Sequence, residues 1–127
     1  MSNFFVLIPS RLESSRLPEK PLKKIGNKTL IQRVYEQASK SDAEKVLVAT
    51  DSEKINLHCL ENNIDTVLTG SDHHTGSDRL AEAVEILTLE DSQIIVNVQG
   101  DEPFTEPTDI NNLYHLMEKK NSNMATL

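Results

Sequence analysis

Three cations are spaced through a loop that follows an apolar run near the start of the chain. The apolar run is Phe4 to Ile8, and the loop from Pro9 to Leu22 carries Arg11, Arg16 and Lys20. Arginine offers phosphate oxygens a planar fork of donors, and lysine offers a compact point charge. An α/β protein presents such groups to phosphorylated ligands at the carboxyl end of a buried strand. The loop therefore predicts a nucleotide or sugar-phosphate site, and its three cations suit a triphosphate.

A carboxylate follows a second apolar run, Ile94 to Val98, in the segment from Gln99 to Pro103. Parallel strands end at the same edge of a sheet, so Asp101 of this segment would face the basic loop. Mg²⁺ takes carboxylate and phosphate oxygens, and Asp101 with a bound phosphate would supply both. A lone aspartate after a strand is more often a turn former or a helix cap. The complete run Gln-Gly-Asp-Glu-Pro is much rarer than a lone aspartate, and it favours a magnesium site.

A polar segment from Thr69 to Arg79 is the third candidate, because it precedes a helical pattern. Free amides at a helix start can hold a base or a phosphate, and this role is compatible with that of an ordinary capping loop. The pair His73 and His74 has no cysteine or spaced third ligand beside it, which argues against zinc. Neither a P-loop motif nor G-x-G-x-x-G occurs, so the P-loop and dinucleotide-binding classes are disfavoured.

The charge of the chain points to a small anion rather than to nucleic acid. The chain has 127 residues, a net charge of −7 and an isoelectric point near 5.0, so its surface as a whole repels polyanions. Six of the 13 lysines and arginines nevertheless lie between Arg11 and Lys28, beside two acids. Such a cluster is often only a solvated face, but its position after a strand favours an anion site.

The cysteine count and the hydropathy of the chain bear on its cellular compartment. Cys59 is the single cysteine, which rules out an intrachain disulfide, and its helical surroundings predict a buried structural thiol. No apolar run approaches the roughly 18 residues of a membrane span, and the first residues lack the pattern of a secretory signal. We expect a cytoplasmic protein that contacts neither membrane nor nucleic acid.

Strand and helix patterns alternate along the chain. Apolar runs predict strands at residues 4–8, 46–49, 66–68 and 94–98. Helical spacing predicts helices at residues 29–39, after Ser52, around 80–87 and around 110–117. Thr29 with Gln32 fits a capping box, and Thr108 is the expected cap of the last helix. The alternation is typical of right-handed βαβ units, so the class is α/β with a mostly parallel sheet and helices on both faces.

The size of the chain fits one nucleotide-binding domain over residues 1–127. A further apolar stretch, Met124 to Leu127, opens at the end of the sequence. It has the pattern of the start of another strand, so we expect the chain to be the front part of a longer protein.

In order and spacing, the motifs resemble the family of 3-deoxy-manno-octulosonate cytidylyltransferases, also called CMP-Kdo synthetases. The matching segments are Ile8 to Arg11, Lys20 to Leu22, Ala49 to Asp51, His74 to Arg79 and Asn97 to Pro103, and the resemblance covers essentially the whole chain. It implies a three-layer, Rossmann-like nucleotide-diphospho-sugar transferase fold, truncated here. It also implies a homodimeric enzyme of lipopolysaccharide biosynthesis, which uses Mg²⁺ to transfer CMP from CTP to Kdo and releases pyrophosphate.

Carried over residue by residue, the resemblance implies catalytic roles for Arg11 and Lys20, as triphosphate-binding cations, and for Asp101, as a metal ligand. Arg16 falls on a further basic position of the same loop. The cytidine and its phosphates would be held by Pro9, Ser10, Gly76, Ser77, Asp78, Arg79, Gln99 and Gly100. The second metal-binding aspartate and most of the Kdo pocket belong to the later half of the family's chains, so we expect this chain alone to be inactive.

Two alternatives stay open at this point. Related nucleotidyltransferases act on other sugar acids or on sugar phosphates, although they should vary the segment from Gln99 to Pro103. A catalytically silent nucleotide-binding module is the alternative from another class, because half of the family's chain is missing. Glu19 stands where the family usually has glycine, and it adds a negative charge beside the predicted phosphate site.

Overall fold

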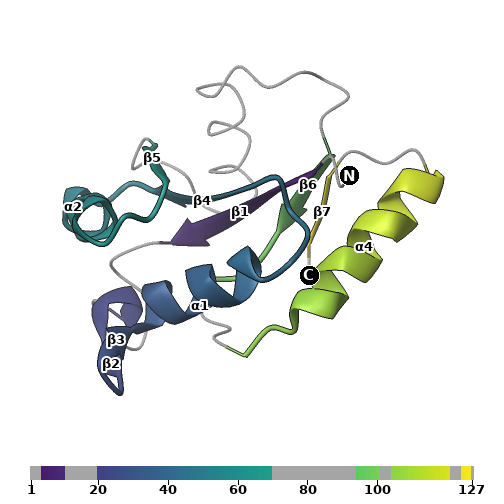
Figure 1. Ribbon diagram of the computed structural model, residues 1–127. Coiled ribbons are helices and arrows are strands. Elements are labelled where there is room, and N and C mark those ends of the chain that lie inside the picture. Colours follow the sequence, from purple (N-terminus) through teal and green to yellow (C-terminus); the bar gives the residue numbers. More distant parts are fainter. Residues whose placement is uncertain (1–3, 11–19, 70–93, 101–103, 121–123, 127) are drawn as a thin grey trace.

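A five-stranded parallel sheet with helices packed against it organises the chain (Figure 1). The structure is a computed structural model that describes residues 4–10, 20–69, 94–100, 104–120 and 124–126. The strands of the sheet are β1 (Phe4–Ser10), β4 (Lys45–Thr50), β5 (Thr66–Leu68), β6 (Ile94–Asn97) and β7 (Met124–Thr126). The helices are α1 (Leu30–Ser39), α2 (Glu53–Glu61) and α4 (Pro107–Lys120), with a short 3-10 helix η1 (Lys20–Leu22) and a hairpin of β2 (Lys24–Ile25) and β3 (Lys28–Thr29). Among these described helices, none has the length and hydropathy needed to cross a membrane.

β1 is the central strand of the sheet, whose order is β5-β4-β1-β6-β7. It pairs in parallel with β4 from Phe5 to Ser10 and with β6 from Phe4 to Leu7. β5 and β7 extend the sheet in parallel on the outer sides of β4 and β6. All five strands therefore end at one edge of the sheet, as the alternating pattern predicts.

The larger part of the core lies between the sheet and three helices. Phe4, Val6 and Ile8 of β1 are fully buried on the face that α1, α2 and α4 cover, and Figure 1 shows α1 and α4 lying across this face. The helices contribute Leu30, Ile31, Val34, Ala38, Ile55, Cys59, Ile110, Tyr114 and Met117. Phe4 stacks on Tyr114 with the ring centroids 4.4 Å apart, which ties β1 to α4. Burial of this shared apolar face, more than helix propensity, stabilises the helices.

A second buried cluster lies on the opposite face of the sheet. Its members are Leu7, Leu47, Ala49, Val67 and Ile95. Because β1 and β4 are buried on both faces, their apolar runs are continuous rather than alternating. The four predicted strands are thereby confirmed, whereas the helix predicted around residues 80–87 lies outside the described residues.

Caps decide where the helices begin. The Thr29 side chain accepts from the Gln32 amide, and Gln32 Oε1 accepts from the Thr29 amide at 2.9 Å, which confirms the predicted capping box. Ser52 caps α2 with its side chain. α4 begins at Pro107, one residue before the predicted cap Thr108, because proline suits a first turn where no amide donor is needed.

The β2–β3 hairpin is an element that the sequence patterns did not predict. Its two-residue turn is Gly26-Asn27, and Gly26 has a φ of +74°, which favours glycine at this position. Arg33 of α1 donates to the carbonyl of Ile25 at 2.7 and 3.1 Å, and Lys28 pairs with Glu36 of α1. The hairpin is therefore fastened to α1 from both of its strands.

Cys59 makes the stability of the fold sensitive to alkali. Burial raises the pKa of its thiol to about 11, although a hydrogen bond with the Thr66 side chain acts in the opposite direction. The unfolded chain loses this proton first, so the contribution is fully present below about pH 8.5 and is lost as the pH rises toward the folded pKa. Over that range, we expect the free energy of unfolding to fall about 2 kcal/mol further in the wild type than in Cys59→Ala. Urea denaturation at a series of pH values measures the difference, and parallel alkaline slopes would contradict it.

Candidate functional site

The order of the strands reverses between β1 and β6, and open α/β sheets have a crevice at the carboxyl edge where such a reversal occurs. After β1 the chain adds β4 and then β5 on one side, and it then crosses over to place β6 on the other side of β1. The strand that follows β6, β7, lies still farther out on that second side. The connections that leave β1 and β6 thus lead to opposite sides of the sheet. Open α/β sheets bind their ligands where this reversal occurs.

The backbones that leave β1 and β6 approach each other closely at this crevice. The Val98 amide donates to the Leu7 carbonyl at 3.0 Å, so the pairing continues one residue beyond β6. Two residues later, a Cβ atom on Gly100 would stand 2.6 Å from the Pro9 carbonyl oxygen. Contact this short is not tolerated by a fixed backbone atom, so the position requires glycine. Four of the predicted binding residues, Pro9, Ser10, Gln99 and Gly100, therefore come together at the end of β1 and β6.

Buried polar side chains gather at the carboxyl edge of the sheet. Ser10 is buried at the end of β1, in register with buried Thr50 at the end of β4. Ser10 Oγ has no hydrogen-bond partner in the described part of the chain, whereas Thr50 Oγ1 accepts from the Ser52 amide at 3.1 Å. Gln99, in contrast, is exposed. The edge thus offers both shielded and open polar groups beside the crevice.

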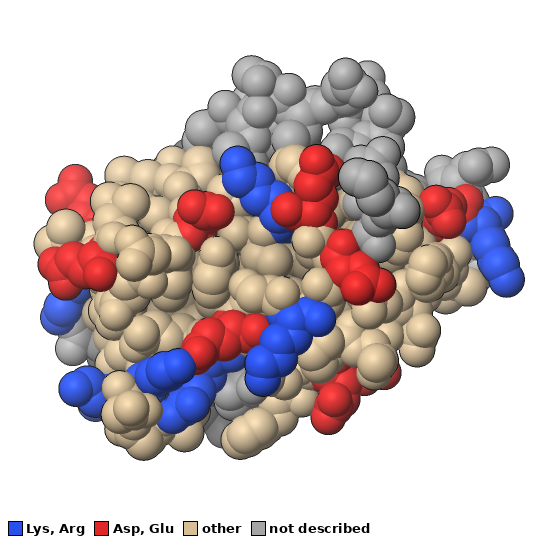
Figure 2. Space-filling model, viewed as in Figure 1, with Lys and Arg blue, Asp and Glu red and all other residues tan. Residues whose placement is uncertain are grey.

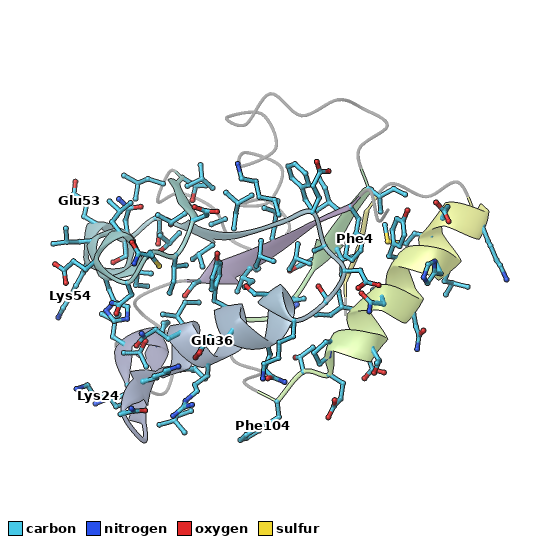
Figure 3. The ribbon with its side chains drawn as sticks, in the orientation of Figure 1. Phe4, Lys24, Glu36, Glu53, Lys54 and Phe104 are labelled. Atoms are coloured by element: carbon cyan, nitrogen blue, oxygen red, sulfur yellow. The ribbon has the colours of Figure 1, made fainter. Side chains whose placement is uncertain are left out.

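The segment after the crevice is anchored again by α1. Gln37 Nε2 of α1 donates to the Thr105 carbonyl at 3.0 Å. The predicted metal ligand Asp101 lies between this anchor and Gly100, outside the described residues. Phe104 is 80% exposed and points away from the body of the molecule (Figure 3). The Asp101 segment is therefore held on one flank by the bond from Val98 to Leu7 and on the other by the Gln37 side chain.

η1 places the backbone of the predicted phosphate ligand Lys20 beside α1. Pro21 is buried, and Leu22 packs against the core under α1. The carbonyl of Lys23, the next residue, accepts from the Leu30 amide at 2.8 Å. η1 and the hairpin connect the basic loop to α1, and the bond from Leu30 to Lys23 holds the end of η1 close to the first turn of α1. The backbone of Lys20 is thereby tied to the first turn of α1.

The basic side chains of the hairpin divide into two kinds. Figure 2 shows lysines and arginines gathered over the hairpin and α1, with acidic groups among them. Lys28 is paired with Glu36, and Arg33 is bonded to the hairpin backbone, so both serve the local structure. Lys23 and Lys24 are exposed, and Lys24 points away from the hairpin in Figure 3. The predicted basic cluster therefore keeps fewer cations for an anion than its count suggests.

Two residues that contact the first turn of α1 were not predicted from the sequence. His58 and Asn62, at the end of α2, make hydrogen bonds with Thr29 and Gln32 of the capping box. The partners are 29 and 30 residues apart in sequence, so no local pattern could have paired them.

Several predicted site residues lie outside the described residues. They are Arg11, Arg16, Gly76, Ser77, Asp78, Arg79 and Asp101, together with His73 and His74. Within the described ranges, no group of three or more His, Cys, Asp or Glu side chains could hold a metal ion. The magnesium site at Asp101 stays a prediction.

Comparison with known proteins adds a family match over nearly the whole chain. The family model described as cytidylyltransferase matches residues 5–127. A 3-deoxy-manno-octulosonate cytidylyltransferase of Pseudomonas fluorescens (strain SBW25) is 50% identical over 125 residues, which are 98% of this chain and 49% of that protein. The protein of the same name from Polynucleobacter asymbioticus is 50% identical over 109 residues, 86% of this chain and 43% of that protein. The chain spans about half the length of these curated relatives.

Solved structures agree with the arrangement of the elements. A structure of CMP:2-keto-3-deoxy-manno-octonic acid synthetase complexed with CTP superposes with a TM-score of 0.86 at 38% identity, covering 93% of this chain and 48% of that one. A cytidylyltransferase from Leptospira borgpetersenii serovar Hardjo-bovis (strain JB197) has a TM-score of 0.76 at 24% identity, covering 94% of this chain and 50% of that one, and it bears on the fold alone. The fold is that of the nucleotide-diphospho-sugar transferases, as predicted.

Gly100→Ala should force the two backbones at the crevice apart. The added Cβ would meet the Pro9 carbonyl oxygen at 2.6 Å, so β1 or the segment after β6 must shift. We expect the free energy of unfolding to fall by about 1 to 3 kcal/mol, as for other overpacked positions. Gln99→Ala, at the exposed neighbouring position, should change it by less than about 0.5 kcal/mol. Denaturant titrations of both variants test the difference, and equal stabilities would show that the contact is not tight.

Proposed function

The chain belongs to the cytidylyltransferase family, and from this membership we propose that it is the CTP-binding part of an enzyme that transfers CMP to Kdo. Relatives at 50% identity are named for this reaction. The neighbour with 38% identity and a TM-score of 0.86 is a complex with CTP. Because the chain spans about half of these relatives, the proposal separates nucleotide binding by this chain from transfer by the complete protein.

One observation carries the proposal, namely the meeting of Pro9 and Gly100 at the strand-order reversal. A site for a nucleotide needs backbone that can approach the ligand without an intervening side chain. Gly100 provides such backbone, and its missing Cβ lets β1 and β6 end side by side. We infer that the cytidine lies over this junction, with Ser10 and Gln99 at its borders. Gly76, Ser77, Asp78 and Arg79 would complete this part of the site.

The triphosphate would lie toward the basic loop. Arg11, Arg16 and Lys20 supply the positive charge that three phosphates require in a chain of net charge −7. Support comes from η1, which is packed against α1 and so gives Lys20 a defined backbone position. Cations held in place stabilise charge that develops on the departing pyrophosphate, because they need no reorganisation during the reaction.

Mg²⁺ fits the donor set that the site would present. Asp101 directly follows Gly100 in the sequence, and phosphate oxygens would complete a hard oxygen ligand set with its carboxylate. When bound, the ion would neutralise phosphate charge and orient the α-phosphate. Asp101 is the only ligand that we assign to it within this chain.

At the α-phosphorus, the proposed reaction forms one bond and breaks one. The anomeric hydroxyl oxygen of Kdo attacks the α-phosphorus of CTP, and the bond from that phosphorus to the bridging oxygen of the β-phosphate breaks. The hydroxyl proton leaves to solvent or a base, and pyrophosphate carries away the electron pair. Phosphoryl-type transfers of this kind depend on alignment and charge neutralisation, so no covalent protein intermediate is required. The residues of this chain bind and orient CTP.

Acceptor identity is tested on the complete protein. Incubation with CTP, Mg²⁺ and Kdo should release pyrophosphate, whereas an acylneuraminate or a sugar phosphate in place of Kdo should not. Turnover with either substitute alone would favour the related nucleotidyltransferases, and CTP binding without turnover on any acceptor would favour the silent module. The homodimer and the cytoplasmic location stay predictions.

Lys20→Ala and Arg11→Ala should each weaken CTP binding by about tenfold or more. A charge-assisted contact to phosphate contributes roughly 1.5 to 3 kcal/mol, and 1.4 kcal/mol corresponds to a factor of ten. Lys45→Ala is a matched control, because Lys45 is exposed at the opposite, amino end of β4. Titration calorimetry of this chain with CTP measures all three. A loss at Lys45 as large as at Lys20 would contradict a localised phosphate site.

Asp101→Asn should remove the Mg²⁺ dependence of CTP affinity while keeping the shape of the side chain. The charge of the carboxylate is what a hard divalent cation requires. Asp109→Asn, in the exposed first turn of α4, serves as the control and should keep the full dependence. CTP titrations with and without Mg²⁺ report the effect. An unchanged Mg²⁺ dependence in Asp101→Asn would remove this residue from the metal site.

A further inference from the structure

Four polar side chains from two distant segments close a ring of hydrogen bonds. Thr29 Oγ1 lies 2.8 Å from His58 Nε2, and His58 Nδ1 lies 3.4 Å from Asn62 Nδ2. Asn62 Oδ1 accepts from Gln32 Nε2 at 3.2 Å, and Gln32 Oε1 accepts from the Thr29 amide at 2.9 Å. The ring joins the first turn of α1 to the last turn of α2.

The two ring nitrogens of His58 face different parts of this ring of hydrogen bonds. Nε2 contacts the Thr29 hydroxyl, which also accepts from the Gln32 amide at 3.3 Å and lies 3.1 Å from Gln32 Oε1. Nδ1 faces Asn62 Nδ2, which donates to the His58 carbonyl at 2.8 Å. Both nitrogens therefore have partners, and these contacts hold the imidazole in one orientation.

The ring lies at the end of residues 20–29, the segment that connects the basic loop to α1 and that we call the limb. Thr29 is 4% exposed and pairs with Lys24 across the hairpin. The next residue, Leu30, donates its amide to the carbonyl of Lys23, directly after η1. Through Thr29, α2 thus braces the backbone at the end of the segment that carries Lys20.

The contact from His58 comes from a different helix than the other contacts of the limb. Arg33 and Lys28 fasten the hairpin to α1 alone, so the hairpin and α1 would move together. His58 belongs to α2, which follows β4 and packs on the same core through Ile55 and Cys59. The ring therefore fixes the limb against a second, independently anchored helix. Small displacements of a phosphate-binding cation are costly, because its interaction with the phosphates depends on distance and alignment.

We propose that His58 is a positioning residue for the triphosphate of CTP, acting through Thr29 on the backbone that directly follows η1, the element that begins at Lys20. The inference rests on the proposed function, since it takes CTP as the ligand. His58 itself does not touch the nucleotide. Loss of its Nε2 contact leaves the Thr29 hydroxyl short of a partner, and only the bond from Gln32 to Asn62 then joins α1 to α2 within the ring.

The test compares two ligands that differ only in phosphate number. Calorimetry gives the affinities of this chain for CMP and for CTP, and the ratio of the two reports the contribution of the added phosphates. We expect His58→Leu to weaken the binding of CTP by about fivefold, which is the effect of one positioning hydrogen bond, and the binding of CMP by less than about twofold. A merely structural role would lower both affinities by the same factor.

Conservative and matched variants complete the experiment. His58→Gln keeps an amide donor near the Nε2 position and should recover most of the CTP affinity. Asn62→Ala removes the support of the imidazole and should give a smaller loss of the same kind, even if His58→Leu folds poorly. His115→Leu, at an exposed histidine of α4, should leave both affinities unchanged.

The outcomes separate this inference from the proposed function. A wild-type chain that binds CTP no more tightly than CMP would overturn the proposed phosphate site itself. A wild type that prefers CTP, with His58→Leu and Asn62→Ala showing an unchanged ratio of CTP to CMP affinity, would overturn only the positioning role of His58.

Discussion

The parallel pairing of β1 on both of its sides is the constraint on which the rest of the structure depends. β1 is hydrogen-bonded to β4 on one side and to β6 on the other, and its side chains are buried on both faces. Such a strand can present groups to a ligand only where it ends. The loop after Ser10 and the segment after Asn97 consequently leave from neighbouring points. The same pairing explains why residue 100 is glycine, because the backbones that leave β1 and β6 are still too close there to leave space for a Cβ atom.

A second consequence concerns where the polar groups are buried. The buried polar side chains in the described part of the chain are Ser10, Thr29, Thr50, Thr69 and Asn97. Four of them end or follow parallel strands at the carboxyl edge, and Thr29 caps the helix that begins there. Burying polar groups costs free energy unless they are hydrogen-bonded, so the core excludes them elsewhere and this edge satisfies most of them with caps and backbone. Stability and the capacity for polar recognition are thereby kept in separate regions of one sheet.

The sequence predicted those parts of the fold that depend on local pattern. The continuous apolar runs identified the four strands, and the capping box located the start of α1 at Thr29. That Pro9 and Gly100 lie at the same edge of the sheet was also predictable, because parallel strands bring their carboxyl ends to one edge, whereas their direct contact depends on the strand order that places β6 beside β1. The hairpin was missed because its strands have only two residues each, too few for a hydrophobic period. The bond from His58 to Thr29 was unpredictable, since it depends on how two helices pack and not on either helix alone.

The distribution of charge limits which anion the crevice can accept. Lys28 is paired with Glu36, which offsets its charge, so the positive field at this edge comes from fewer residues than the six cations counted between Arg11 and Lys28. The remainder of the chain is acidic, with a net charge of −7. Fields of exposed charges decay over about 8 to 10 Å at physiological salt, which is similar to the length of a triphosphate. A longer polyanion would extend from the basic loop over repelling surface. The same acidic background that would repel nucleic acid would thus favour the proposed compact nucleotide, whose charge spans no more than the basic loop.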